Sequence, residues 1–165
     1  MRKILCFAVL YSLCAASYGQ ADSTEQPVYL RFPTIPEFNI YLAKDSSEFT
    51  RESLKKRKAT VFIIFSPDCE FCQHETKEII KNIDKFEKAQ IIMITDMPYK
   101  EMRDFYTDYK IADYPAFTMG KEAKYYLPMF FHIKYMPAIF VYDKKGRFKK
   151  AFEGSVKIEK ILEEL

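Results

Sequence analysis

The sequence predicts an α/β fold: a central mixed sheet with helices on both faces and an antiparallel hairpin at the C-terminal end. Apolar runs at Thr60–Phe65, Gln90–Ile94 and Ala138–Tyr142 are typical of buried strands. Segments with helical periodicity lie between these runs, and this alternation indicates βαβ units. The turn Asp143–Gly146 leads into Arg147–Glu153, which predicts a hairpin and therefore an antiparallel pair of strands.

The N-terminal part of this fold is expected to contain one strand and one short helix. Two prolines in Arg31–Pro36 restrict the backbone, so this segment is predicted to be an extended arm. Glu37–Leu42 alternates polar and apolar residues, the pattern of a half-buried strand. The Ser46–Glu48 triplet offers an N-cap, which predicts a short helix through about Arg57.

Three further helices are predicted from apolar residues that recur at helical spacing. The first follows the strand Thr60–Phe65 and contains Phe71, Ile79, Ile83 and Phe86. The second covers Tyr99–Tyr109, and the last begins at a cap formed by Ser155. Between them, Ile111–Tyr135 is interrupted by Pro and Gly, which predicts a loop with a short helix around Lys121–Leu127.

The first residues have the pattern of a secretory signal. Arg2 and Lys3 precede an apolar run, Ile4–Ala16, which is shorter than the roughly 20 residues needed to span a bilayer. Ser17–Gly19 then supplies small residues that a signal peptidase reads. Residues 1–19 are therefore predicted to be a cleaved signal peptide that directs the chain across the inner membrane to the periplasm.

A lipoprotein signal is the alternative, and it requires a cysteine directly after small residues. Cys14 follows Leu13 instead, so no lipid anchor is expected. After cleavage, residues 20–31 are expected to form a flexible polar segment. Residues 32–165 are expected to form a single domain, which is long enough to bury a sizeable core.

Cleavage would leave two of the four cysteines, Cys69 and Cys72. A disulfide between residues this close constrains the unfolded chain little, so it would stabilise the fold only slightly. The pair is better suited to be a reversible dithiol. The two cysteines lie where a buried strand ends and a helix begins. Because a helix N-terminus stabilises anions and a thiolate is an anion, this position favours reactivity.

The charge distribution gives little support to nucleic-acid binding. Loss of Arg2 and Lys3 lowers the formal net charge from +3 to +1. The basic clusters Lys55–Lys58 and Lys144–Lys145 are separated by turns and apolar runs, which favours solvated faces. No nucleic-acid partner is therefore expected.

The cysteine motif and its surroundings resemble a known family. Cys69–Cys72 follows a buried strand, Tyr135–Pro137 directly precedes the strand Ala138–Tyr142, and the turn Asp143–Gly146 comes next. Pro33–Phe38 is similar to the family's proline-aspartate-phenylalanine segment, with glutamate in place of aspartate. From about residue 32 onward, the chain resembles the thioredoxin fold, and in particular the exported thiol–disulfide oxidoreductases of the ResA/TlpA type.

The resemblance implies a role for each matching residue. Cys69 would be the attacking nucleophile and Cys72 the resolving thiol. Pro137 would follow a cis peptide bond and face the dithiol, with Met136 and Tyr135 next to the substrate. No bound cofactor is implied beyond the redox-active Cys69–Cys72 disulfide. The partners would be a protein disulfide or dithiol substrate and a membrane or extracytoplasmic electron donor.

Several positions depart from the family pattern. Asp68 stands where an aromatic residue is usual before the first cysteine, and Ile63 stands where thioredoxins carry a buried acid. Proton transfer during resolution therefore has no evident carboxylate. Asp68, Glu70 and Glu75 are the candidates to modulate the ionisation of the thiols.

Two other classes of protein remain open. A non-catalytic thioredoxin-like module could bind a partner through the same surface, or the cysteines could deliver copper with the help of His74 or His132. On a helix, His74 would turn away from the cysteine pair, so no metal site is expected. An aromatic set is expected mostly in the core, with Tyr135 as the exception: Tyr114, Phe117, Tyr125, Tyr126, Phe130, Phe131 and Tyr135.

The acids that flank Cys69 predict a reducing dithiol. Asp68 and Glu70 oppose the helix dipole, so the thiolate and hence the reduced form are stabilised less. The reduction potential is therefore expected to lie closer to that of thioredoxin than to that of a strong oxidant. Redox titration with a glutathione or dithiothreitol couple checks this, and a potential above about −150 mV would contradict it.

Overall fold

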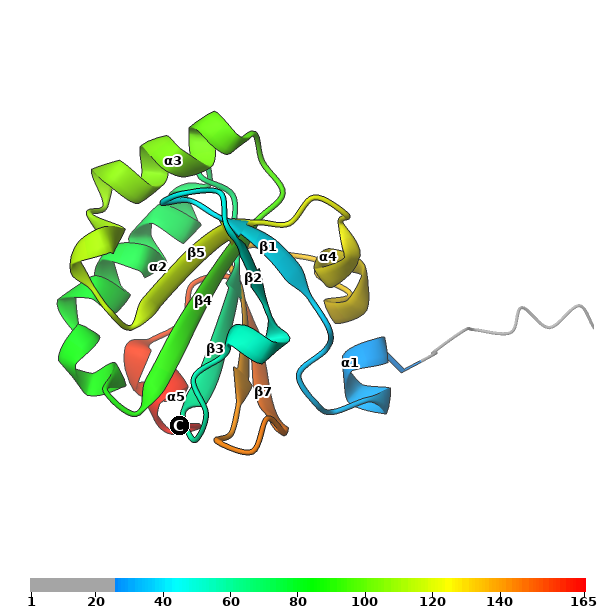
Figure 1. The fold of residues 1–165 in the computed structure, drawn as a ribbon. Helices are drawn as coiled ribbons and strands as arrows, with labels where there is room; N and C mark the ends of the chain where they lie inside the picture. The colour runs from blue at the N-terminus through cyan, green and yellow to red at the C-terminus, as the bar shows by residue number, and fades with distance from the viewer. Residues whose placement is uncertain (1–25) are drawn as a thin grey trace, which may run out of the picture.

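A β-sheet forms the centre of the computed structural model, which describes residues 26–165 (Figure 1). The predicted signal peptide, 1–19, and residues 20–25 lie outside the described part. The strands are β1 (Asn39–Leu42), β2 (Glu48–Thr50), β3 (Ala59–Ile64), β4 (Ala89–Thr95), β5 (Phe117–Lys121), β6 (Ala138–Tyr142) and β7 (Phe148–Glu153). They form one seven-stranded sheet in the order β2-β1-β5-β4-β3-β6-β7. Strands β3, β4 and β5 are parallel, while β6 is antiparallel to β3.

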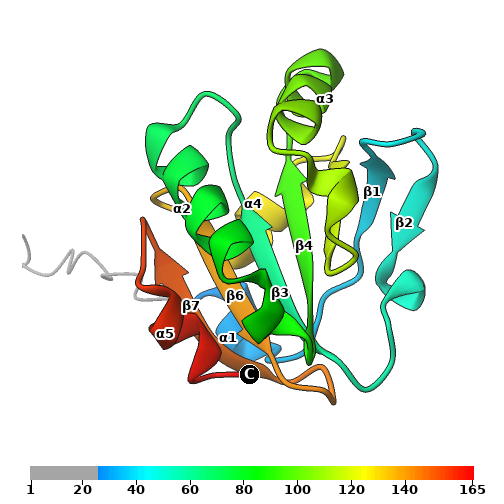
Figure 2. The ribbon, with the colours of Figure 1, turned by 90° about the vertical axis from the view of Figure 1, so that its left-hand side faces the viewer.

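Helices cover both faces of the sheet, as Figure 2 shows from the side. They are α1 (Val28–Arg31), α2 (Glu70–Lys81), α3 (Tyr99–Asp108), α4 (Tyr126–Phe131) and α5 (Ile158–Leu162), with 3-10 turns η1 (Arg51–Ser53), η2 (Ile83–Phe86) and η3 (Ile111–Asp113). Alternate residues of β3 point to opposite faces. Val61 and Ile63 pack in the core beneath α2, α3 and α5, while Phe62 and Ile64 pack in the core beneath α4. The predicted α/β class with a mixed sheet and a C-terminal hairpin is confirmed.

The predicted helix from Ser46 to Arg57 is wrong. Residues 48–50 instead form β2, which pairs antiparallel with β1, and only η1 is helical. The Asp45 carboxylate accepts hydrogen bonds from the backbone N–H and the hydroxyl of Ser47, at 3.0 and 2.6 Å. Because Asp45 closes a turn here, the chain reverses as a hairpin before a helix can start.

The segment Ile111–Tyr135 contains a strand that the sequence pattern did not predict. β5 lies between β4 and β1 in the sheet, so it gains partners on both sides. The short helix α4 begins at Tyr126, later than the predicted Lys121–Leu127. Its start is set by Glu122, a buried carboxylate that accepts the N–H of Leu127 at 3.0 Å.

The ends of the chain also differ from expectation. Residues 28–31, predicted to belong to a flexible segment, form α1, and Tyr29 packs edge-on against Phe140 and Phe148 at 5.3 and 5.1 Å between ring centroids. Ser155 does not cap α5, whose N-cap residue is Lys157. Within the described residues, no helix is long and apolar enough to cross a membrane.

Replacement of Gly120 tests the close packing of β5 against β1. A Cβ atom at this position would lie 2.8 Å from Ile40 Cδ1 and 3.0 Å from the Tyr41 carbonyl oxygen. Since the carbonyl belongs to the backbone of the neighbouring strand, Gly120→Ala is expected to lower the free energy of unfolding by about 1–3 kcal/mol. Denaturant unfolding measures this.

Gly154→Ala is the matched control because its added methyl group meets nothing within 4 Å. Its φ of +76° nevertheless strains alanine. This variant is expected to lose about 1 kcal/mol. If Gly120→Ala lost no more than Gly154→Ala, the packing argument for β5 would fail.

Candidate active site

The candidate site is built at the point where β3 ends and α2 begins. Every residue of β3 is buried, and the chain leaves the sheet through Ser66 and Pro67. The Ser66 hydroxyl donates to the Asp68 carboxylate within this turn. Cys69 is the N-cap residue of α2, with extended backbone dihedrals, and Cys72 lies one turn inside the helix.

Two hydrogen-bond donors converge on the Cys69 sulfur. The backbone N–H of Cys72 lies 3.2 Å from it and the Cys72 thiol 2.7 Å. The sulfur also lies at the N-terminus of α2, where Cys69 is the N-cap residue. Both cysteines are free. Their sulfurs would need to approach only slightly to reach the roughly 2.05 Å bond length of a disulfide.

The two thiols differ in exposure. Cys69 is partly exposed, whereas Cys72 is 1% exposed. Burial raises the pKa of the Cys72 thiol well above its usual range, and the hydrogen bond to Cys69 raises that pKa further. Cys69 is therefore the cysteine whose sulfur a partner can reach, whereas Cys72 is buried and is favoured in its protonated thiol form.

The turn before β6 lies against the dithiol. The peptide bond between Met136 and Pro137 is cis, and the Met136 carbonyl oxygen lies 3.9 Å from Cys69 Sγ. Pro137 is buried, Met136 is half-buried, and Tyr135 is 69% exposed beside them. The structure thus places Met136 against Cys69, with Tyr135 and Pro137 as its neighbours in the chain.

The acids near Cys69 are in different environments. Asp68 and Glu70 are exposed, while Glu75 is 2% exposed on the buried face of α2, one turn after Cys72. Glu75 Oε2 accepts the Val156 N–H at 3.0 Å, and Oε1 is buried with no hydrogen-bond partner among the described residues. Burial raises the pKa of the Glu75 carboxyl.

A loop after β7 supports the site, and sequence reasoning missed it. The Gly154 N–H donates to the Pro137 carbonyl at 2.8 Å, the Ser155 hydroxyl donates to the Phe71 carbonyl at 3.3 Å, and Val156 binds Glu75. These three consecutive residues therefore tie the prolyl turn to α2. A glycine directly after the predicted hairpin was the available signal, since Gly154 has a positive φ.

Other predicted residues lie apart from the dithiol or in the core. Phe71 was expected on the packed face of its helix, but it is 66% exposed because the buried face contains Cys72, Glu75, Thr76 and Ile79. His74 and His132 are exposed. Residues 26–165 contain no group of three or more His, Cys, Asp or Glu side chains that could hold a metal ion.

The aromatic set is divided between core and surface. Phe117, Phe130 and Phe131 are buried, as expected for core packing. Tyr125 and Tyr126 were also expected in the core, but their side chains are 51% and 44% exposed because they stand at the start of α4.

A cysteine pair at the end of the central strand, opposite a cis-proline before an antiparallel strand, defines a thioredoxin fold. No family model and no curated protein sequence matches the chain. Solved structures share its fold. MTB dsbF is 18% identical with a TM-score of 0.66, and the match covers 79% of this chain and 96% of dsbF.

Two further structures show the same likeness. A secreted disulfide oxidoreductase of Mycobacterium tuberculosis, described as homologous to E. coli DsbE, is 17% identical with a TM-score of 0.64, covering 77% of this chain and 92% of that one. StoA from Bacillus subtilis is 17% identical with a TM-score of 0.59, covering 79% and 98%. At these identities, the comparisons establish the thioredoxin fold.

The buried carboxyl of Glu75 predicts a pH-dependent stability. Because its pKa is raised on folding, the native state binds more protons than the unfolded state between the usual pKa and the raised one. Stability therefore falls as the pH rises through this interval. Glu75→Gln removes the ionisation and is expected to be more stable than the wild type at neutral pH but not near pH 4.

Thermal unfolding across this pH range measures the effect. Glu70→Gln, an exposed acid on the same helix, serves as the control and should show no such gain at neutral pH. Equal stability of Glu75→Gln and wild type at neutral pH would mean that the carboxylate is not destabilised by burial.

Proposed function

We propose that the protein is an exported thiol–disulfide oxidoreductase that reduces protein disulfides through Cys69 and Cys72. The observation that carries the proposal is the pairing of an accessible sulfur at a helix N-cap with a buried thiol 2.7 Å away, next to a cis-prolyl turn. The accessible sulfur can attack a disulfide of a partner protein. The buried thiol beside it can then attack the resulting mixed disulfide and release the partner.

Reduction would proceed in two exchange steps. The Cys69 thiolate attacks one sulfur of a substrate disulfide, forming a mixed disulfide and releasing the other substrate sulfur, which takes up a proton. Cys72, as its thiolate, then attacks Cys69 Sγ, and the second substrate thiol leaves. The substrate gains two electrons and two protons, and the protein retains a Cys69–Cys72 disulfide. An external electron donor must reduce this disulfide before the next cycle.

The second step requires that Cys72 lose its proton. Since burial raises the pKa of this thiol, spontaneous ionisation is unfavourable, and a nearby base would assist. Glu75 is the strongest of the three candidate acids, because it is buried on the same face of α2 as Cys72 and has a free carboxylate oxygen. Asp68 and Glu70 are exposed and suit the role less well.

The prolyl turn supplies a surface for the substrate backbone. The Met136 carbonyl lies close to Cys69 Sγ, so a substrate segment bound to that sulfur would pass beside Met136 and the exposed ring of Tyr135. An extended segment could pair with this backbone as an added strand does. We assign Tyr135, Met136 and Pro137 to substrate contact.

Export is supported by the N-terminal pattern and by the secreted relative from M. tuberculosis that shares the fold. A protein in that compartment needs reducing equivalents from a membrane or extracytoplasmic donor, because the cytosolic reductants do not reach it. The acids beside Cys69 favour the reducing direction.

Cysteine variants test the activity with insulin as the disulfide substrate and dithiothreitol as the donor. The wild type is expected to accelerate reduction, whereas Cys69→Ala is expected to fall to the rate of dithiothreitol alone, since the attacking sulfur is lost. Cys72→Ala should form the mixed disulfide but not resolve it, and non-reducing electrophoresis and mass spectrometry would detect the trapped adduct.

Lys81→Ala is the control because this exposed side chain lies at the end of α2 that is far from the dithiol, and it should keep wild-type activity. If the wild type gave no acceleration over dithiothreitol alone, the chain would be a non-catalytic thioredoxin-like binding module. Copper bound in equal molar amount only by the reduced form would instead favour metal delivery.

A further inference from the structure

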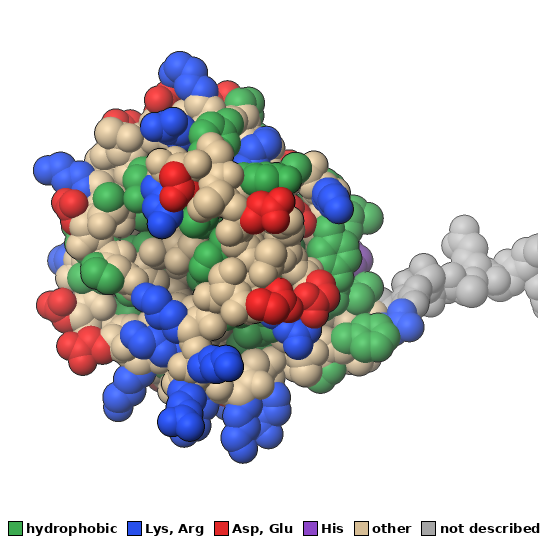
Figure 3. Space-filling view, viewed as in Figure 1, with side chains coloured by type: hydrophobic (Ala, Val, Ile, Leu, Met, Phe, Trp, Pro, Cys, Tyr) green, Lys and Arg blue, Asp and Glu red, His purple; other side chains and the backbone are tan. Residues whose placement is uncertain are grey.

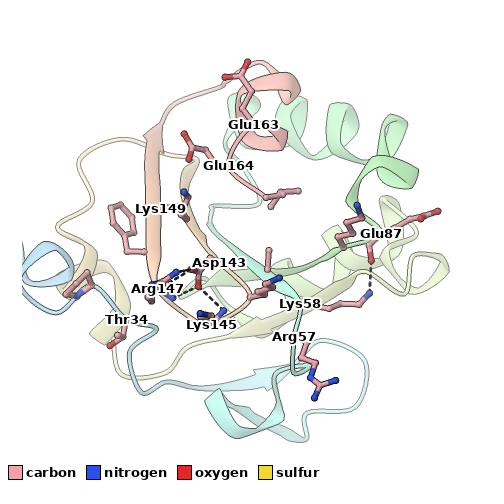
Figure 4. Close-up of a pocket in the computed structure, with 16 residues that line it drawn as sticks. Thr34, Arg57, Lys58, Glu87, Asp143, Lys145, Arg147, Lys149, Glu163 and Glu164 are labelled. Atoms are coloured by element: carbon pink, nitrogen blue, oxygen red, sulfur yellow. Dashed lines mark hydrogen bonds and ion pairs between the residues drawn. The ribbon is translucent and has the colours of Figure 1, made fainter.

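The end of the sheet opposite the dithiol carries a large basic hollow. It has a volume of about 1310 Å³ and is open to solvent. Figure 4 shows cationic side chains around it from two separate segments, the residues before β3 and the β6–β7 turn with the start of β7. The residue before β4 also lines it. The cations are Arg57, Lys58, Lys88, Lys144, Lys145, Arg147 and Lys149.

Most of this positive charge is not neutralised within the described structure. Arg147 pairs with Asp143 at 2.8 Å, but the other six cations make no ion pair among residues 26–165. Four acidic side chains line the hollow. Two of them are already paired: Asp143 forms an ion pair with Arg147, and Glu163 forms one with Lys160. Only Glu87 and Glu164 remain to oppose the six cations, so the hollow is strongly positive.

The positive surface continues beyond this hollow. A second hollow of about 360 Å³ shares Arg57, Lys58 and the Asp143–Lys145 segment with the first and adds Lys55 and Lys56. We call the surface formed by residues 55–58, Lys88, 144–145 and Lys149 the basic end. Figure 3 shows Lys and Arg side chains gathered at the lower edge of the molecule, below β3, β4 and the β6–β7 turn.

Strand pairing creates the basic end from clusters that are far apart in the sequence. Thr60 pairs with Tyr142 across β3 and β6, so residues 55–58 and 144–145 leave the same end of the sheet. The clusters were expected to be separate solvated faces, because turns and apolar runs separate them in the chain. Those same turns and strands bring them together.

The basic end and the dithiol lie at opposite ends of the molecule. The cations precede β3 at Ala59, whereas Cys69 follows its other end at Ile64. Six residues of strand span about 20 Å. This exceeds the roughly 10 Å Debye length at 0.1 M salt, so the cations leave the chemistry of Cys69 unaffected.

The shape of the basic end fits an extended anionic surface better than a single small anion. With the exception of Lys58, its cations are exposed, and they lie in turns and at strand ends, where no buried cradle encloses them. We propose that the basic end docks the protein on an anionic phospholipid surface through the headgroup phosphates. In that orientation the dithiol faces the aqueous compartment, where protein substrates can reach it.

Nucleic acid fits this surface less well. Single strands are held by exposed aromatic rings on which bases stack. Phe148, the aromatic residue that lines the hollow, instead packs against Tyr29 and Tyr142. The cations line a hollow and its rim, and none lies on a helix that could enter a major groove.

Vesicle flotation tests the proposal, using phosphatidylcholine mixed in equal parts with phosphatidylglycerol. The wild type is expected to float with these vesicles at low salt, to be released as salt rises, and not to float with phosphatidylcholine alone. Each lysine near an anionic surface contributes about five-fold to binding, so the triple variant Lys88→Gln, Lys144→Gln, Lys145→Gln should bind about 100-fold more weakly.

A matched triple variant carries the same charge change at the dithiol end: Lys44→Gln, Lys124→Gln, Lys157→Gln. These lysines are exposed and follow β1, β5 and β7. This variant should bind vesicles as the wild type does. Circular dichroism of both variants verifies the fold, and a double Cys69→Ala, Cys72→Ala variant should bind fully, which separates docking from redox activity.

Three outcomes would overturn the proposal. One is no flotation of the folded wild type with anionic vesicles at low salt. Another is equal weakening by the two triple variants, which would show that net charge acts without a specific surface. The third is displacement from vesicles by an oligonucleotide at a phosphate concentration far below that of the lipid, which would assign the surface to nucleic acid.

Discussion

The pairing of β3 with β6 is the constraint on which the rest of the structure depends. Ile64 lies opposite Ala138 in this antiparallel pair, so the residues that follow β3 and those that precede β6 emerge at the same end of the sheet. Cys69 comes shortly after the first and the Met136–Pro137 bond directly before the second. A slip of one residue in this register would exchange the side chains that β6 packs into the two cores, Ile139 and Val141 on one face and Phe140 on the other, so packing on both faces fixes the register and with it the site.

The same pair separates two ends of the sheet that have different physical properties. At one end, the Cys72 thiol and the Glu75 carboxyl are buried, and burial raises the pKa of both groups. At the other, cations remain in water and act over a distance set by salt. Because the strand separates them by more than that distance, the reaction and the proposed docking can be altered independently.

The support around the dithiol is distributed over distant parts of the chain. The N-cap geometry of α2 is local, but the loop Gly154–Val156 contacts both the prolyl turn and α2 through three consecutive residues. Glu75 is buried, one of its carboxylate oxygens accepts the Val156 N–H, and the other has no partner among the described residues. A carboxyl held in this way is costly for stability, and such groups are common where proton transfer is needed.

The central strands, the start of α2 and the position of the cysteine pair could be predicted from local sequence, because each depends on a pattern within a few residues. A continuous apolar run is buried on both faces in nearly any α/β context, and a CxxC pair that follows one lies at a helix N-terminus. Tertiary structure decided the rest. β5 forms a strand because β1 and β4 are hydrogen-bonded to it on both sides. β2 forms a strand because it pairs with β1 in a hairpin, where the local pattern predicted a helix. Phe71 is exposed, Glu75 is buried, and the basic clusters lie together. Each of these features depends on neighbours that are distant in the sequence, and no local pattern encodes those neighbours.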